Sequence, residues 1–92
     1  MKIEFSKKAY QRLEALADYI YEQSNSKKTT IAYIKKLRQY IIETLTHFPQ
    51  AGRPSVELAP NTRKLVYQGF SIVYRTASDR IEILTIYREN LP

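Results

Sequence analysis

The sequence predicts a single α+β domain over residues 1–92, in which an antiparallel helical hairpin packs on a small antiparallel β-sheet. Apolar residues in the first half recur at intervals of three and four, the period of a helix, whereas residues 62–87 alternate with the period of a strand. At 92 residues the chain is too short for two independent hydrophobic cores. We therefore expect the helices to cover one face of one sheet.

A short strand and a helix are expected at the start of the chain. Residues Lys2–Phe5 alternate polar and apolar side chains, which favours a strand. Ser6 is a candidate N-cap, and apolar residues then recur at helical spacing as far as Gln23. The sequence Ser24-Asn25-Ser26 ends this helix, because its three side chains compete for backbone hydrogen bonds.

A second helix is predicted from about Thr29 to Phe48, with Pro49 as its stop, because the residue before a proline disfavours helical torsion angles. Its connection to the first helix is only about five residues long, so the two helices are expected to form a hairpin. The apolar stripe of this helix consists of Ile34, Leu37, Ile41, Leu45 and Phe48.

Three strands are expected after a loop over residues 50–60. They cover Thr62–Tyr67, Phe70–Thr76 and Arg80–Tyr87, which are rich in β-branched and aromatic residues. The short links Gln68-Gly69 and Ala77-Ser78-Asp79 make the three strands an antiparallel meander. The last strand is apolar on both faces near its centre, which predicts that it is the best-buried strand.

Composition restricts the classes of function. Fifteen Lys and Arg against nine Asp and Glu give a net charge of +6, which favours an acidic or polyanionic partner. The absence of cysteine and the single histidine exclude Cys-ligated and His-cluster metal sites, so neither a metal nor a cofactor is expected. No apolar run reaches the length of about 18 residues that a membrane span needs, and the N-terminal residues do not read as a secretory signal. We expect a cytoplasmic protein with no membrane contact.

Strong catalytic motifs, such as a phosphate-cradling glycine loop, HExxH or GxSxG, are missing from the sequence. Two concentrations of basic residues remain, and each is either a solvated surface or a docking surface for an anionic partner. The first, on the second helix, consists of Lys27, Lys28, Lys35, Lys36 and Arg38. The second, on the sheet, consists of Arg63, Lys64, Arg75 and Arg88, with Tyr67 and Tyr87 interleaved. Cations beside aromatic rings suit a nucleotide or an extended acidic peptide, but which of them converge depends on the strand register.

Four phrases of the sequence, in their order, resemble the RelE/ParE superfamily of bacterial toxins from type II toxin–antitoxin modules. The resemblance covers nearly the whole chain and implies that superfamily's fold. The phrases are His47-Phe48-Pro49-Gln50-Ala51-Gly52-Arg53-Pro54, Thr62-Arg63-Lys64-Leu65-Val66, Phe70-Ser71-Ile72-Val73-Tyr74-Arg75 and Ile81-Glu82-Ile83-Leu84-Thr85-Ile86-Tyr87.

The superfamily has two main activities, between which the sequence must be placed. RelE-like members cut mRNA in the ribosomal A site, which requires cations around the phosphate and a group that moves the 2′-hydroxyl proton. ParE-like members are not enzymes: they poison DNA gyrase and so arrest growth. For RelE-like chemistry the resemblance implies Arg63, Lys64, Arg75 and Arg88 as phosphate-binding residues and Tyr87 as the proton-transfer group.

The ParE-like interpretation is preferred. Ser71 replaces the arginine that RelE-like members carry on the middle strand, and their basic, tyrosine-containing extension does not follow before Pro92. The last strand ends Tyr87-Arg88-Glu89-Asn90, so Tyr87 takes the position of a histidine in the family's frequent His-Gly-Arg-Arg. We expect gyrase to be the target, bound through Arg75, Tyr87 and Arg88. The alternatives are mRNA cleavage on the ribosome and an inactive relic that only binds an antitoxin.

A cognate antitoxin is the second expected partner, in a hetero-oligomer with the toxin. The charge of +6 predicts an acidic, partly disordered antitoxin segment that folds on binding. Tyr33, Tyr40 and Tyr67 are the candidate antitoxin-binding anchors, because aromatic side chains contribute much to binding. The alternative is that these three rings only complete the edge of the hydrophobic core.

Overall fold

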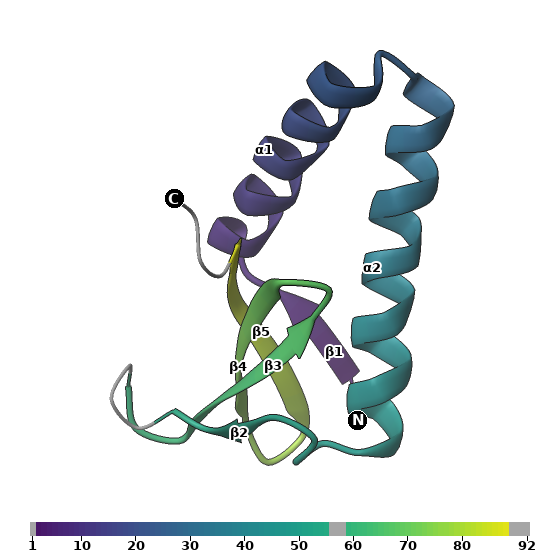
Figure 1. Cartoon of the computed structure of the whole chain (residues 1–92). Coiled ribbons are helices and arrows are strands. Elements are labelled where there is room, and N and C mark those ends of the chain that lie inside the picture. Colours follow the sequence, from purple (N-terminus) through teal and green to yellow (C-terminus); the bar gives the residue numbers. More distant parts are fainter. Residues whose placement is uncertain (1, 56–58, 89–92) are drawn as a thin grey trace.

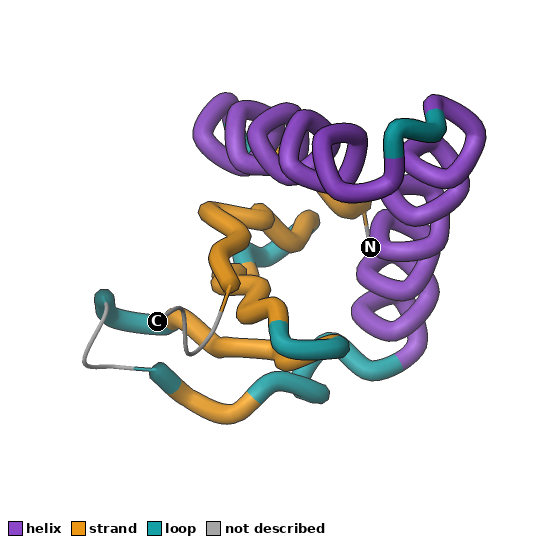
Figure 2. The backbone as a smooth tube through the Cα atoms, turned by 45° about the horizontal axis from the view of Figure 1, so that its top comes forward, coloured by secondary structure: helices purple, strands orange, loops and turns teal. Residues whose placement is uncertain are grey.

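The computed structural model describes residues 2–55 and 59–88, in which the predicted helices and strands appear in the predicted order, with one additional short strand. Figure 1 shows the two helices diverging from their short turn, and Figure 2 shows the strands inside the angle that the helices form. The sheet has five strands in the order β1-β5-β4-β3-β2. The elements are β1 (Lys2–Phe5), α1 (Lys7–Ser24), α2 (Lys27–His47), β2 (Arg53–Pro54), β3 (Thr62–Tyr67), β4 (Phe70–Thr76) and β5 (Arg80–Arg88).

Both helices begin at a serine cap. The Ser6 hydroxyl oxygen accepts a hydrogen bond from the backbone N–H of Ala9 at 3.0 Å, as the sequence predicted, and Ser26 accepts one from Thr29 at 3.1 Å. Asn25 ends α1 in the left-handed conformation, with φ of 52°. Because Ser26 caps the second helix, α2 begins at Lys27, earlier than its apolar stripe alone indicated.

The sheet is mixed, which corrects the expected antiparallel sheet. Strands β3, β4 and β5 form the predicted antiparallel meander. Strand β1 instead pairs parallel with β5; the connection between them is long, as a parallel pair requires, since it contains both helices and strands β2 to β4. Strand β2 lies in the predicted loop and pairs antiparallel with β3. At two residues it is too short to show a period in the sequence.

The hydrophobic core lies between the helices and one face of the sheet. Phe48 does not belong to it, although it was predicted to continue the α2 stripe: it is 68% exposed, since it is the C-cap and its torsion angles have left the helix. The expectation that β5 is the best-buried strand is also wrong, because β4 lies at the centre of the sheet and Phe70–Tyr74 are all buried. The core consists of Ala9, Leu13, Leu37, Ile41, Leu45, Leu65, Phe70, Ile72, Tyr74, Ile81, Ile83 and Ile86.

A β-bulge explains why β5 is apolar on both of its apparent faces. Val73 pairs with Thr85 and Tyr74 pairs with Ile83, so Leu84 is an extra residue in β5. The bulge reverses the alternation and lets Ile83 and Ile86 both reach the core. The Ser6 hydroxyl donates to the Leu84 carbonyl at 2.8 Å, so the residue that caps α1 also satisfies the bulge.

Candidate functional site

At one end of the sheet, Tyr74 and Arg63 hold the loop that follows α2. We call the group formed by Tyr74, Arg63, Pro49 and Gly52 the tyrosine joint. The fully buried Tyr74 hydroxyl donates to the Pro49 carbonyl at 2.8 Å and accepts from the Gly52 N–H at 2.9 Å. The Arg63 guanidinium donates to the Gly52 carbonyl at 2.7 Å. A Cβ atom on Gly52 would lie 2.8 Å from the Tyr74 ring and 2.9 Å from the Lys64 backbone, so only glycine fits.

The electrostatics of the joint follow from burial. Burial raises the pKa of the Tyr74 hydroxyl, while the Gly52 N–H and the Arg63 charge act in the opposite direction. The hydroxyl therefore stays protonated and keeps its bond to Pro49. These contacts give Pro49 and Gly52, from the first of the four family-like phrases, a structural role, and they occupy Arg63, one of the predicted phosphate-binding arginines.

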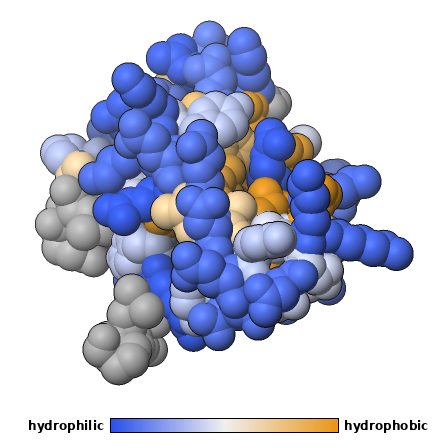
Figure 3. Space-filling model, turned by 90° about the horizontal axis from the view of Figure 1, so that it is seen from above, coloured by the Kyte–Doolittle hydropathy of each residue, from blue (hydrophilic) through white to orange (hydrophobic). Residues whose placement is uncertain are grey.

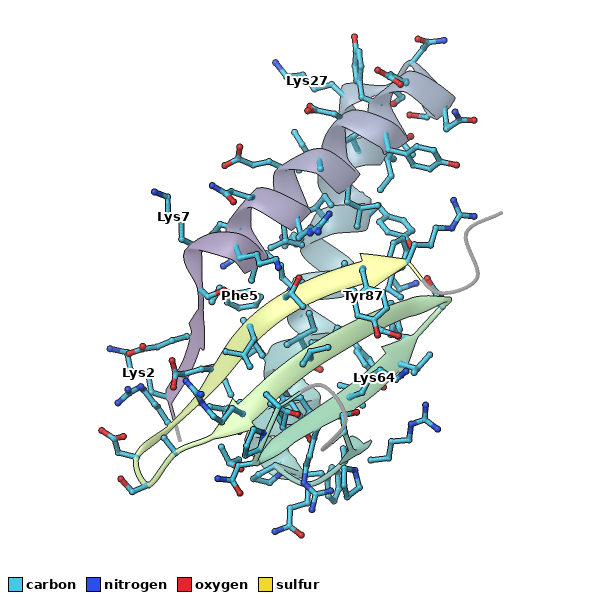
Figure 4. All side chains as sticks on the ribbon, turned by 90° about the vertical axis from the view of Figure 1, so that its left-hand side faces the viewer. Lys2, Phe5, Lys7, Lys27, Lys64 and Tyr87 are labelled. Carbon is cyan, nitrogen blue, oxygen red and sulfur yellow. The ribbon has the colours of Figure 1, made fainter. Side chains whose placement is uncertain are left out.

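Three of the predicted site residues share the face of the sheet turned away from the helices. Lys64 pairs with Val73, Tyr87 pairs with Ser71, and Arg75 follows Val73 by two positions on β4, so their side chains leave the sheet on the same side. Figure 4 shows Lys64 and Tyr87 on the side facing away from α2. Arg75 makes an ion pair with Glu82 at 3.2 Å, which offsets part of its charge.

The other two predicted cations lie on the opposite face. Arg63 pairs with Tyr74 and Arg88 pairs with Phe70, and both aromatic residues belong to the core beneath the helices. Arg63 is at the tyrosine joint, and Arg88 is at the far end of β5. The sheet thus separates the five candidates into a group of three and two single residues.

Arg88 borders a hollow between α1 and the ends of β4 and β5. Its guanidinium donates to the Tyr19 hydroxyl at 3.1 Å and its central carbon lies 5.6 Å from the Tyr19 ring centre. The hollow has a volume of about 230 Å³. We call this surface the Arg88 hollow; it is lined by Arg12, Ala15, Leu16, Tyr19, Phe70, Ile86, Tyr87 and Arg88. Its apolar floor and two guanidinium groups suit an apolar side chain next to a carboxylate.

Sequence reasoning missed Arg12 and Tyr19. The signal was present in the sequence: the two residues are seven positions apart, so they lie two turns apart on one side of α1. They are not in the apolar stripe, which is why they were not singled out. Tyr19 is 45% exposed.

The three predicted antitoxin anchors all lie at the edge of the core, where they make two ring contacts. Tyr40 from α2 stacks on Tyr67 from β3 with ring centres 4.1 Å apart, and Tyr33 meets Phe70 edge-on at 6.3 Å. All three tyrosines are half-buried and pack against the core. They therefore have a structural role, and each of the three also stays partly exposed.

One of these three anchors, Tyr33, lies beside the Arg88 hollow. A second hollow reaches Tyr33 and shares Leu16, Tyr19, Phe70 and Arg88 with the first. Burial raises the pKa of the Tyr33 hydroxyl, with a further rise from Tyr67 and an opposing effect of Arg88. One candidate target-binding residue therefore lies beside the candidate antitoxin anchors.

The described part of the chain contains no group of three or more His, Cys, Asp and Glu side chains that could hold a metal ion. No helix within it combines the length and the apolar character that crossing a membrane requires. Glu89 and Asn90, at which the sequence departs from the family's frequent ending, lie outside the described residues.

Comparisons with known proteins agree on the family and the fold. The family model described as "ParE toxin of type II toxin-antitoxin system, parDE" matches residues 3–90. A solved chromosomal ParDE TA system from P. aeruginosa superposes with a TM-score of 0.82 at 26% identity, over 98% of this chain and 97% of that one. The toxin–antitoxin complex RelBE2 from Mycobacterium tuberculosis gives 0.70 at 15% identity, over 96% of each chain, which is a likeness of fold. No curated protein matches the sequence.

Proposed function

Because this chain belongs to the family of ParE toxins of type II toxin–antitoxin systems, we propose that it arrests growth by binding DNA gyrase and is neutralised by an acidic antitoxin. Both partners are macromolecules, and the chain acts by binding rather than by catalysis. A gyrase target implies that the protein works in the cytoplasm.

The observation that carries this proposal is the position of Arg88. This arginine is exposed, borders an apolar hollow, and shares a second hollow with Tyr33, one of the three candidate antitoxin anchors. An acidic antitoxin segment that laid an apolar side chain in the hollow and a carboxylate on Arg88 would also reach Tyr33. Neutralisation then follows from simple competition, since the antitoxin hides a residue that the target needs.

The separation of the basic residues supports binding over RNA cleavage. Stabilising a phosphate transition state requires several cations aimed at one phosphate. Here Arg63 is engaged with Gly52, Arg88 lies on the other face from Lys64 and Arg75, and Arg75 is paired with Glu82. Ser71, which replaces the RelE-like arginine, is fully buried, so a longer side chain at this position would not fit.

Two assays on one preparation of the protein test the target. We expect inhibition of gyrase supercoiling and no cleavage of mRNA on programmed ribosomes. Arg88→Ala should weaken the inhibition, whereas Arg53→Ala, which removes an exposed arginine of β2 far from both hollows, should not. Ribosomal cleavage with no effect on supercoiling would refute the gyrase assignment and favour the RelE-like activity.

The antitoxin part is tested by binding. The triple variant Tyr33→Leu/Tyr40→Leu/Tyr67→Leu keeps an apolar core edge but removes the rings and hydroxyls. We expect it to lose affinity for the cognate antitoxin at least tenfold. Unchanged affinity in a folded triple variant would leave these tyrosines with a structural role alone.

A further inference from the structure

A second apolar surface lies on the helical hairpin, away from the sites described above. It is a hollow lined by helix residues only, which we call the hairpin groove: Ala17, Thr30, Ile31, Ile34, Lys35, Arg38, Gln39 and Ile42. Ile31 is 60% exposed and Ile42 is 38% exposed, although both are large apolar residues. Viewed from the end of the hairpin turn, the molecule shows hydrophobic surface among hydrophilic side chains (Figure 3).

Two matching stripes of residues run along the hairpin groove: the α2 stripe lines it, and the α1 stripe consists of Ala17, which lines it, and three residues that helical spacing places on the same side of α1. Members of each stripe are separated by four, three and four positions, the spacing that keeps side chains in line along a helix. The α1 stripe is Tyr10, Glu14, Ala17 and Tyr21, and the α2 stripe is Ile31, Lys35, Arg38 and Ile42. Each stripe has exposed large apolar residues at its two ends, while the charge between them is acidic on α1 and basic on α2.

The two stripes are also in register with each other. Measured from the Asn25-Ser26 turn at about 1.5 Å per residue, the members of the α1 stripe lie within about 2 Å of the levels of their α2 counterparts. Tyr10 corresponds to Ile42, Glu14 to Arg38 and Tyr21 to Ile31. A surface with this pattern is complementary to itself when it is turned about an axis that runs along the hairpin.

The charged side chains of the two stripes make no ion pair within the described part of the monomer. Over residues 2–55 and 59–88, neither Glu14 nor Lys35 makes an ion pair. The Arg38 guanidinium lies over the Phe5 ring at 5.3 Å and has no carboxylate partner in the same part of the chain. A purely acidic partner would be attracted by α2 but repelled by Glu14 on α1. A second copy of this chain satisfies both borders of the groove.

We propose that the hairpin groove is a self-association surface, through which two free toxin chains form a two-fold dimer. In this dimer α1 of each copy packs against α2 of the other, which makes a four-helix contact with Tyr10 on Ile42 and Tyr21 on Ile31. Glu14 pairs with Arg38 at two equivalent places. The dimer leaves the Arg88 hollow uncovered, because that hollow lies on the other side of α1.

Sedimentation and light scattering of the free full-length chain over a range of concentrations test the proposal. We expect a concentration-dependent dimer, and the double variant Ile31→Lys/Ile42→Lys should raise its dissociation constant at least tenfold. Both side chains are exposed, so the variant should keep its unfolding midpoint. Val66→Lys is the matched control: it replaces a 52% exposed apolar residue on β3 and should leave the dimer unchanged.

Charge exchange distinguishes a second copy from any other occupant. Glu14→Arg and Arg38→Glu should each weaken the dimer, and their combination should restore it. Lys35→Glu reverses another charge in the groove but keeps the Arg38–Phe5 contact, so a weaker dimer in this variant cannot be explained by misfolding after loss of that contact. A wild-type chain that is monomeric at all concentrations would overturn the proposal. A charge-exchanged double variant that does not regain dimerisation would overturn it as well. If the protein is monomeric and Ile31→Lys lowers its affinity for the antitoxin, the groove belongs to the antitoxin instead.

Discussion

Arg63 and Arg88 lie on the same face of the sheet, but the contacts of their guanidinium groups differ completely. Arg63 is half-buried and donates to the Gly52 carbonyl at 2.7 Å, beside a fully buried tyrosine. Arg88 is exposed, and its partner is the hydroxyl of Tyr19, itself 45% exposed. The tyrosine joint is thus a satisfied network, whereas the Arg88 hollow offers a cation and an apolar floor to another molecule.

The comparison teaches that residue type does not separate a structural cation from a binding cation. A guanidinium that satisfies buried carbonyls belongs to the fold, because its removal leaves unpaired backbone groups. A guanidinium on an exposed ring contributes little to stability and is free to bind. Substitutions at the two ends of the sheet should therefore separate stability from function.

The largest loss of stability is expected at neither end but in the core between them. Leu37 and Ile41 are fully buried, so Leu37→Asp or Ile41→Asp would place an unpaired carboxylate in the core. This costs several kcal/mol against a total stability of roughly 5–10 kcal/mol, and the domain should unfold. Circular dichroism measures the loss of folded structure, and urea titration measures the loss of stability. A cooperative, native-like Leu37→Asp variant would contradict the assignment of the buried helix face.

At the tyrosine joint, Gly52→Ala should cost about 2–4 kcal/mol, because the new methyl group would overlap the Tyr74 ring and the Lys64 backbone. The backbone cannot move aside without stretching the pairing of β2 with β3. Gly69→Ala is the control: Gly69 has a φ of 84° but no atom near the added methyl group, so its cost is limited to backbone strain of about 1 kcal/mol. Equal losses for the two variants would show that packing at Gly52 is not the cause.

Tyr74→Phe should cost about 1–3 kcal/mol, since it leaves the Gly52 N–H and the Pro49 carbonyl without their partner. The effect should depend on pH. The folded-state pKa of Tyr74 is raised above the usual value of about 10, so its contribution is complete below that pH and declines as the pH rises through the folded-state value. In urea titrations the difference between wild type and Tyr74→Phe should shrink above about pH 10. A constant difference would mean that Tyr74 does not titrate in this way.

The order of the elements was predictable because the signals for them are local. Ser6 and Pro49 mark helix ends by their own chemistry, and the Gln68-Gly69 turn needs only two residues with positive φ, which both have. The parallel pairing of β1 with β5 and the Ser6 hydrogen bond to the bulge residue Leu84 both join residues 78 positions apart, so no local pattern reveals them. Phe48 shows the same limit, since helical spacing alone does not tell where a helix unwinds.

The candidate site was predictable in its residue types but not in its arrangement. The sequence singled out Tyr33, Tyr40 and Tyr67; all three lie at the edge of the core, where Tyr40 of α2 stacks on Tyr67 of β3. It also grouped Arg63 with Arg88, and the register separates these two by four positions along β4, because Arg63 pairs with Tyr74 and Arg88 with Phe70. Which side of a strand a residue occupies is fixed by register, and a shift of one position would reverse it.

The smallest effect on stability is expected for a substitution of Arg88, at the end of the sheet away from the tyrosine joint. Arg88→Ala removes an exposed hydrogen bond and a cation–π contact with Tyr19, so the free energy of unfolding should fall by no more than about 0.5–1 kcal/mol. Arg63→Ala should cost more, because the Gly52 carbonyl loses its donor. For growth arrest the order should reverse: on induced expression at equal protein levels, Arg88→Ala should relieve the arrest, while folded Arg63→Ala should retain it. If Arg88→Ala stays fully toxic, or destabilises the domain as much as Arg63→Ala, the division between a structural and a binding end of the sheet is wrong.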